Sequence, residues 1–360
     1  MEHGIVQSSG GKFYGWPANN GIWSWGNEIL VGFTEAEYME KDKGHSFNQE
    51  GPRKSVLSRS LDGGSTWKLE CPEAYPEGFS FGDDGADAGA EISNTKAPID
   101  FLAPDLAIRC RDRTILVSQD RGHTWDGTRR FPAFGFSESL TSRTDYLPLS
   151  RDECLFFISV KDPQVKAGIR DRAFAVRTSD GGRSFERLGF LLPETPELRS
   201  VMPSTVRVSE RSLVSALRRR VDVEDTEGAK KSRCWIDAAI SEDLGSSWRF
   251  LSKITDTHTD QSQHNGNPPS MVRLHDGRLC LVYGYRAAVM GMKVRISADE
   301  GATWSGPLSL RDDARTWDFG YPRSVVRPDG KVLSVYYYTT EAHKEQHIAY
   351  TIWTVDELGS

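Results

Sequence analysis

One eight-residue pattern recurs five times in this chain and limits the folds that it can adopt. The pattern is Ser/Thr-x-Asp-x-Gly-x-Ser/Thr-aromatic, and successive copies begin 58, 60, 63 and 56 residues apart. Self-similarity at such a regular period is typical of solenoids, propellers and repeat arrays. The five copies are Ser60–Trp67, Ser118–Trp125, Thr178–Phe185, Ser241–Trp248 and Ser297–Trp304.

The residue types of this pattern predict a tight turn between two strands. An aspartate accepts hydrogen bonds from backbone amides downstream of it, and glycine supplies the positive φ that the turn needs. The Ser/Thr hydroxyl closes the loop from the other side, and the aromatic ring packs between strands. Apolar or alternating runs such as Phe174–Val176 and Ile236–Ile240 precede the turns and are typical of strands.

A second, weaker repeat upstream of the turns adds a hairpin to each period. Segments beginning at Pro203, Pro269 and Pro322 each contain a strand, a polar turn and a second strand. Each period therefore supplies four short antiparallel strands, which is the composition of a β-propeller blade. Six periods of about 60 residues fill the 360-residue chain. We predict an all-β, six-bladed β-propeller that forms one domain over residues 1–360, with the N-terminal strand His3–Ser8 closing the ring in the last blade.

The charge balance and the lack of long apolar runs exclude several classes of protein. The chain has 45 Lys and Arg against 51 Asp and Glu, a net charge of −6, whereas nucleic-acid binders normally carry a basic surplus. No apolar run approaches the roughly 18 residues of a membrane span, and the N-terminus has no signal-peptide pattern. We expect no nucleic-acid partner, no membrane span and no cofactor. We expect the protein in the cytoplasm or, if a signal has been removed, in the periplasm or outside the cell. The oligomeric state stays open.

The five cysteines lie far apart and include no Cys-x-x-Cys pair. This spacing favours thiols in the core over a disulfide framework or a zinc site. Each repeated turn offers one or two carboxylates rather than a full set of calcium ligands. We therefore predict no metal site.

The repeated turns resemble the Asp-box, or BNR repeat, of the sialidase (neuraminidase) superfamily, over essentially the whole chain. Sialidases of this kind are six-bladed propellers, in agreement with the number of periods. Their Asp-boxes are structural and lie away from the substrate. The resemblance thus implies a structural role for Asp62, Asp120, Asp180, Asp243 and Asp299.

In a propeller the substrate pocket lies on the central axis, where the inner strands begin. Several polar or aromatic segments stand directly before apolar strands in this chain. Their mixture of aromatic faces and fixed polar groups suits a sugar. The substrate-binding residues predicted from these segments are Trp16, Asn19, Asn20, Arg143, Asp145, Arg199, His264, Asn265, Asn267 and Arg323.

The resemblance also implies a mechanism, namely retaining hydrolysis with a tyrosine nucleophile, a glutamate that raises its reactivity and an aspartic acid as acid/base residue. Tyr321 matches the nucleophile because it precedes the inner strand of the last blade, and Asp318 is its predicted partner. The acid belongs in the polar region of the first blade, where Glu35, Asp42 and His45 are candidates. We predict His45 or Glu35, since histidine titrates near neutrality.

Sialidases hold the substrate carboxylate with three arginines. One arginine stands in a Phe/Tyr-Arg-Ile-Pro segment of the first blade, but the comparable segment here, Phe13–Pro17, contains none. The nearest cation is Lys12, and lysine does not replace a bidentate clamp. We predict Arg323 and Arg143 as anion clamps, with Arg323 on the same strand face as Tyr321. The arginines that could assemble another cationic pocket are Arg143, Arg199, Arg286 and Arg323.

These observations predict a carbohydrate-active enzyme, a sialidase-like exo-glycoside hydrolase that acts on a terminal acidic (sialic or uronic) or deoxy sugar of a glycan or glycoconjugate. Two alternatives stay open. Related propellers include polysaccharide lyases and rhamnosidases that use histidine and tyrosine, and His45 with Tyr321 suits proton abstraction beside a uronate. The second alternative is a glycan-binding propeller without catalytic activity.

Overall fold

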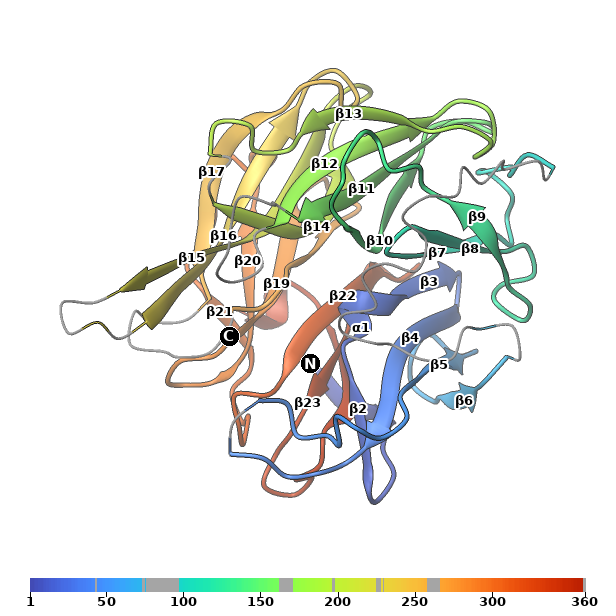
Figure 1. Cartoon of the computed structure of the whole chain (residues 1–360). Coiled ribbons are helices and arrows are strands. Elements are labelled where there is room, and N and C mark those ends of the chain that lie inside the picture. Colours follow the sequence, from blue (N-terminus) through green and yellow to red (C-terminus); the bar gives the residue numbers. More distant parts are fainter. Residues whose placement is uncertain are drawn as a thin grey trace.

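The structure is a computed structural model that describes residues 1–42, 44–72, 75, 97–161, 171–195, 198–224, 228, 230–257 and 266–358. Within this part of the chain the strands form six sheets. Figure 1 shows the sheets arranged around a common centre. The all-β, six-bladed propeller predicted from the repeats is thereby confirmed.

The sheets follow one another in chain order, and the strands within each sheet pair antiparallel. The first sheet contains β2 (Lys12–Gly15), β3 (Gly21–Trp25), β4 (Glu28–Glu37), β5 (Lys54–Ser60) and β6 (Lys68–Glu70). The second contains β7 (Ala107–Arg111), β8 (Thr114–Ser118) and β9 (Asp126–Arg130). The third contains β10 (Leu140–Pro148), β11 (Cys154–Lys161), β12 (Asp171–Thr178) and β13 (Glu186–Phe190).

The last three sheets each have four strands in the described residues. The fourth contains β14 (Arg199–Arg207), β15 (Leu213–Glu224), β16 (Lys230–Ser241) and β17 (Arg249–Asp256). The fifth contains β18 (Ser270–Arg273), β19 (Leu279–Tyr285), β20 (Gly291–Ser297) and β21 (Leu308–Arg311). The last contains β22 (Gly320–Val326), β23 (Val332–Tyr338), β24 (His347–Trp353) and β1 (Glu2–Gln7). A 3₁₀ turn, η1 (Asp356–Leu358), follows β24.

The ring closes through the N-terminal strand, as predicted. β1 pairs antiparallel with β24, from Glu2 opposite Ile352 to Gln7 opposite Ile348. In Figure 1 the blue first sheet lies beside the red last sheet. The two ends of the chain also meet directly, because the Met1 amino group lies 2.5 Å from Glu357 Oε1.

The repeated turns have the predicted hydrogen bonds. In the first, Asp62 Oδ1 accepts from the Ser60 hydroxyl at 2.8 Å and the Thr66 amide at 2.9 Å, and Asp62 Oδ2 accepts from the Thr66 hydroxyl at 2.6 Å. The Ser60 hydroxyl accepts in turn from the Gly64 amide. The other four copies repeat this pattern. The carboxylates are therefore used within their own turns.

In two of the turns the glycine lies where neighbouring blades approach each other closely. Gly64 has φ 100°, and a Cβ added there would lie 2.9 Å from Leu333 Cδ2 in the last sheet. At Gly122, φ is 85°, and the added Cβ would lie 2.3 Å from Leu30 Cδ2 in the first sheet. Both the backbone conformation and the lack of space require glycine.

The apolar core is divided among the interfaces between neighbouring sheets. Phe13 and Val31 of the first sheet pack with Tyr337 of the last sheet, and Leu30 packs with Trp125 of the second. Burial between blades leaves the polar side chains at the strand ends. Among the described residues, no helix has the length and apolar character needed to cross a membrane.

Two local features differ from four regular strands per blade. The inner edge of the first sheet is split, because helix α1 (Pro17–Asn20) separates β2 from β3. Trp16 has a left-handed backbone conformation (φ 58°) before the helix, and Pro17 suits the first turn of the helix. The second sheet has three strands within the described residues.

Candidate active site

Successive blades present the same strand ends on the same side of the ring. Since neighbouring strands run antiparallel, the start of each inner strand, the end of the second and the start of the third lie on one face. We call it the entrance face, and the opposite side, which carries the five aspartate turns, the turn face. The entrance face carries Asp318 and Tyr321 before and within β22, His45 between β4 and β5, and Arg199 at the start of β14.

His45 and Asp318 form a close pair on the entrance face. The distance from His45 Nδ1 to Asp318 Oδ1 is 2.5 Å. The second carboxylate oxygen accepts from the Ser46 amide at 3.1 Å and from Gln346 Nε2 at 3.0 Å. Burial raises the pKa of Asp318, but His45 and the hydrogen bonds outweigh it and hold the pKa below its ordinary value. Asp318 is thus an ionised carboxylate that orients the imidazole.

The His45 ring remains accessible from solvent. Its side chain is 26% exposed, whereas the Asp318 side chain is 2% exposed. The edge of Trp16 contacts the imidazole, with ring centroids 5.0 Å apart, and Trp317 lies on another side at 5.6 Å. With Nδ1 held by Asp318, Nε2 is the ring nitrogen that can exchange a proton with a ligand.

Tyr321 is held in a left-handed backbone conformation at the start of β22, with φ 50°. Asn267 Oδ1 accepts from its backbone amide at 2.7 Å, and Asn267 Nδ2 donates to the Phe319 carbonyl. A Cβ at the preceding Gly320 would lie 2.1 Å from Asn267 Oδ1. The fully buried Asn267 therefore positions the Tyr321 backbone rather than offering its amide to a ligand.

Three arginine side chains act on the Tyr321 phenol. Arg218 Nη1 lies 3.3 Å from the phenolic oxygen. Burial raises the pKa of Tyr321, but the charges of Arg218, Arg286 and Arg199 outweigh it and lower the pKa below its ordinary value. This combination of a half-buried phenol and nearby guanidinium groups is an anion-binding environment.

A hydrogen-bond chain joins this cationic region to the His45–Asp318 pair. The Tyr337 hydroxyl donates to Asp318 Oδ1 at 2.7 Å, and Arg286 Nη2 donates to the Tyr337 hydroxyl at 3.2 Å. The Tyr337 ring also contacts Tyr321 edge-to-face, at 6.0 Å between centroids. The phenol, the arginines and the histidine pair thus form one connected site.

A second buried carboxylate, Asp171, pairs with one of the arginines. Its Oδ2 is 3.3 Å from Arg199 Nε. Burial raises the pKa of Asp171, and the charge of Arg199 only partly offsets this effect. Burial and the nearby charge of Arg218 lower the pKa of Arg199 to about 10, with Asp171 acting in the opposite direction.

Arg323 and Tyr321 make different hydrogen bonds. The pairing register shifts between Gly320 and Arg323, which breaks the alternation of side chains along β22. Arg323 Nη2 donates to the Ala18 and Arg143 carbonyls. The Arg143 guanidinium donates to the Ser142 carbonyl. Arg323 therefore joins blades near the axis.

Asp145 lies deeper along the axis, beside Arg323. Its two oxygens accept from the Thr205 amide and hydroxyl. Burial raises the pKa of Asp145 to about 7, although Arg323 and these hydrogen bonds oppose the rise. Asp145 and Arg323 line a cavity of about 370 Å³ formed by the far ends of the inner strands.

Glu35 belongs to a different cluster. Its Oε1 lies 3.3 Å from Lys12 Nζ and 3.4 Å from Lys54 Nζ, and these ion pairs lie across the β2–β4–β5 register. Among the contacts of the described residues, Glu35 is not joined to Asp318 or Tyr321. His45, rather than Glu35, lies with the predicted partner.

Of the remaining predicted residues, Asn19 and Asn20 are buried. Asn20 is fully buried, and its Oδ1 accepts from Arg109 Nη2 at 2.7 Å. Asn19 is 4% exposed, and its Oδ1 has no hydrogen-bond donor among the described residues. His264 and Asn265 lie outside the described residues.

Sequence reasoning missed Arg218 and Asp171. Arg218 belongs to a run of three arginines, Arg218–Arg220, that is followed closely by acidic residues. It directly follows the segment Leu213–Leu217 inside β15 and is 3% exposed. Asp171 begins the third strand of its blade, whereas outside the first blade only inner-strand entrances were considered. Both residues could have been found from the sequence as charged residues that stand within or directly before an apolar strand.

The comparisons with known proteins agree with this architecture. Residues 104–333 match the BNR repeat-like domain. The chain belongs to the BNR repeat-like domain family. The match spans more than half of the chain and includes four of the five repeated turns. A comparison with curated proteins finds no match.

Several solved structures share the fold of this BNR repeat-like protein. One is a protein of unknown function from Dyadobacter fermentans (21% identity, TM-score 0.68, covering 98% of this chain and 97% of that one). Another is an α-L-arabinanase from Penicillium chrysogenum (12%, 0.60, 99% and 99%). A third is the NanB sialidase from Streptococcus pneumoniae (12%, 0.58, 99% and 71%). At these identities the similarity establishes the sialidase-like propeller fold.

Proposed function

We propose that this BNR repeat-like protein is a glycoside hydrolase that removes a terminal acidic sugar at the entrance face, with Tyr321 as nucleophile. The observation that carries the proposal is the contact of Arg218 Nη1 with the Tyr321 phenol at 3.3 Å, to which the charges of Arg286 and Arg199 add in lowering the pKa of the phenol. A lowered pKa makes the phenolate more accessible and so activates the nucleophile. The sialidase-like fold and its glycosidase relatives support a carbohydrate as substrate.

The same arginines favour a sugar that carries a carboxylate. Guanidinium groups bind carboxylates by charge-assisted hydrogen bonds. A carboxylate nucleophile would repel such a sugar. Most retaining glycosidases use a carboxylate as nucleophile, and a tyrosine nucleophile is the known exception. The first blade lacks the expected arginine, and Arg218 from β15 supplies a third positive charge instead.

His45 takes the acid/base role in this proposal. The Tyr321 phenolate forms a bond to the anomeric carbon while the bond from that carbon to the leaving oxygen breaks. Protonated His45 gives its Nε2 proton to that oxygen. Neutral His45 then accepts a proton from water, whose oxygen displaces Tyr321 from the sugar. Asp318 orients the ring through Nδ1 and stabilises its protonated form.

The test is digestion of a glycan panel, including sialosides, uronides, arabinosides and 4-methylumbelliferyl sialoside, with mass spectrometry of the products. We expect free sugar from the wild type and a loss of more than about 10³-fold for Tyr321→Phe. Tyr350→Phe removes a hydroxyl that contacts Glu2 on the outer strand, and serves as the control. Full turnover by Tyr321→Phe would remove the assigned role.

A polysaccharide lyase is the second candidate, and the same phenol favours it. In that reaction the Tyr321 phenolate takes the proton next to the uronate carboxylate, the bond to the leaving oxygen breaks, and a carbon–carbon double bond forms. His45 again protonates the leaving oxygen. Reaction in ¹⁸O-water separates the two, since hydrolysis labels the released sugar, whereas elimination gives an unlabelled product with the ultraviolet absorbance of an unsaturated uronate.

A further inference from the structure

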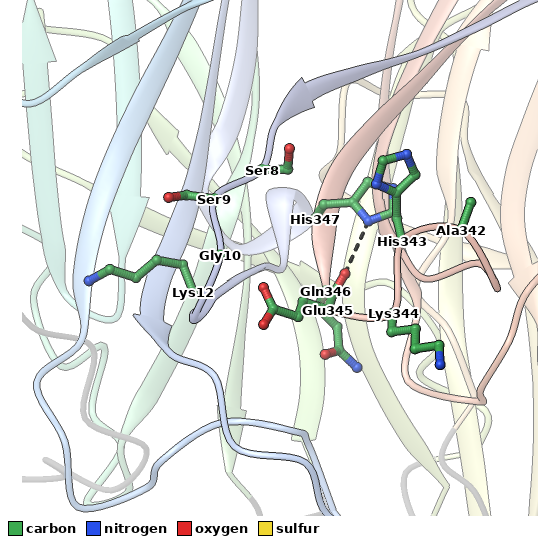
Figure 2. A pocket seen from close by; sticks show the side chains of 10 residues that line it. All are labelled: Ser8, Ser9, Gly10, Lys12, Ala342, His343, Lys344, Glu345, Gln346 and His347. Carbon is green, nitrogen blue, oxygen red and sulfur yellow. Dashed lines mark hydrogen bonds between the residues drawn. The ribbon is translucent and has the colours of Figure 1, made fainter.

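A polar cavity of about 250 Å³ lies at the seam between the last and first blades. Figure 2 shows its two walls, the turn between β1 and β2 and the loop between β23 and β24. Both connections belong to the entrance face, because β2 begins there and β23 ends there. The side chains that carry its polar groups are Ser8, Ser9, Lys12, His343, Lys344 and Glu345.

Hydrogen bonds between the walls give the cavity a fixed shape. The Glu345 carboxylate accepts from the Gly11 amide, at 3.0 and 3.2 Å for its two oxygens. The Tyr14 amide donates to the Gln346 carbonyl at 2.9 Å. Within the loop, His347 Nδ1 lies 3.1 Å from the Glu345 carbonyl (Figure 2). The walls are therefore preorganised, which lowers the entropic cost of binding.

Gln346 connects this cavity with the proposed acid/base pair. It lines the cavity, is 2% exposed, and donates from Nε2 to Asp318 Oδ2 at 3.0 Å. Because a carboxylate only accepts hydrogen bonds, this contact fixes which end of the amide faces Asp318. The other end, Oε1, is buried and has no donor among the described residues. One side chain thus separates the cavity from the residue that holds His45.

We infer that this cavity binds the sugar unit on the leaving-group side of the scissile bond. The inference rests on the proposed function, in which His45 protonates the leaving oxygen. Gln346 joins the cavity to Asp318, which holds the proposed proton donor His45, so we assign a sugar in the cavity to the leaving group. The protein is then an enzyme for oligosaccharides or glycoconjugates rather than for simple glycosides.

The walls are suited to a hydroxyl-rich ligand. Serine hydroxyls, lysine ammonium groups, an imidazole and a carboxylate supply donors and acceptors around one small space. Sites for drug-sized ligands usually span about 300–1,000 Å³, and this cavity is smaller. A single saccharide unit matches both its size and its polarity.

The test fills the cavity without touching the proposed catalytic residues. A Cβ added at Gly10 meets nothing within 4 Å, so Gly10→Trp places an indole at the cavity wall without a clash in the core. Ala342→Trp blocks from the opposite, exposed wall. Gly306→Trp is the matched control, because Gly306 is also open but lies after the fifth aspartate turn on the other face.

The measurement compares two substrates that share a terminal sugar, for example 3′-sialyllactose with methyl sialoside and arabinobiose with methyl arabinofuranoside. We expect both blocking variants to lower kcat/KM for the oligosaccharide by about tenfold, equivalent to one or two lost hydrogen bonds. The methyl glycoside and the control should stay within about twofold of wild type.

The outcomes separate this inference from the proposed function. If the wild type cleaves glycans and the blocking variants keep its preference for the longer substrate, the subsite assignment is overturned and the proposed function stands. If the wild type neither cleaves nor binds any panel glycan by saturation-transfer NMR, the proposed function falls and the subsite falls with it.

Discussion

Aspartates on the two faces of the propeller differ in their hydrogen-bond partners and in their roles. On the turn face, Asp299 is exposed and receives its hydrogen bonds from Ser297 and Thr303, residues of its own turn. On the entrance face, Asp318 is buried, and its partners include His45 from the opposite end of the chain. Local partners make a stable turn, whereas distant partners assemble a site.

The two faces also differ in what sets the pKa of each carboxyl group. Hydrogen bonds from Thr303 lower the pKa of Asp299. On the entrance face burial raises the pKa of Asp171, while His45 and other partners overcome burial and lower the pKa of Asp318. Carboxyl groups with pKa values pushed in opposite directions in one site are typical of acid/base chemistry.

The largest effect in this comparison is expected for Asp318→Asn. The amide cannot stabilise a protonated His45 or accept hydrogen bonds with both of its terminal atoms. We expect kcat to fall by about 10²–10⁴-fold, the usual contribution of acid/base catalysis, on the best substrate of the glycan panel.

Asp299→Asn is the matched control on the turn face. It makes the same chemical change in a carboxylate with only local partners. Equal losses of kcat in the two variants would contradict the division of roles between the faces. Thermal unfolding of both variants shows whether each remains folded.

A smaller effect is expected for Arg218→Met. Removing the guanidinium 3.3 Å from the Tyr321 oxygen takes away a charge that lowers the pKa of this phenol. The acidic limb of the kcat/KM profile should move to higher pH, because the phenolate then forms only at higher pH. At neutral pH we expect a loss of roughly 10–100-fold, the range for a hydrogen bond to a charged group.

Arg278→Met is the control for this variant. Arg278 pairs with the exposed Asp276 in the hairpin between β18 and β19, on the turn face. Its pH profile should match that of the wild type. An unshifted acidic limb in Arg218→Met would show that Arg218 does not set the ionisation of Tyr321.

The contrast between the faces also explains what the sequence could predict. The turns, the six blades and the ring closure follow from patterns of two to eight residues and from their spacing, and each was confirmed. The pairing of His45 with Asp318 joins residues 273 positions apart. The sequence placed Asp318 at a strand entrance and His45 in a polar region of the first blade, but only the arrangement of the blades brings them into contact.

The arginines show the limit of strand alternation as a guide. Two residues along a regular strand share a face, but the register of β22 shifts between Gly320 and Arg323, and the two side chains have different hydrogen-bond partners. Arg218 projects toward Tyr321 from a strand 103 residues away in sequence. Bulges and contacts between blades have no short-range signature.

The smallest effect is expected for Asp299→Asn on stability. Asparagine keeps an acceptor for the Ser297 hydroxyl and the Thr303 amide, and only the hydrogen bond from the Thr303 hydroxyl at 2.5 Å must rearrange. We expect a loss of about 0.5–1 kcal/mol in the free energy of unfolding, as for one solvent-screened hydrogen bond. Because the folded pKa of Asp299 is below its ordinary value of 3.8, the wild-type advantage is present above that pH and is lost as the pH falls. Urea unfolding at neutral pH and near pH 3 measures the difference, and an advantage that grew at low pH would contradict the assigned hydrogen bonds.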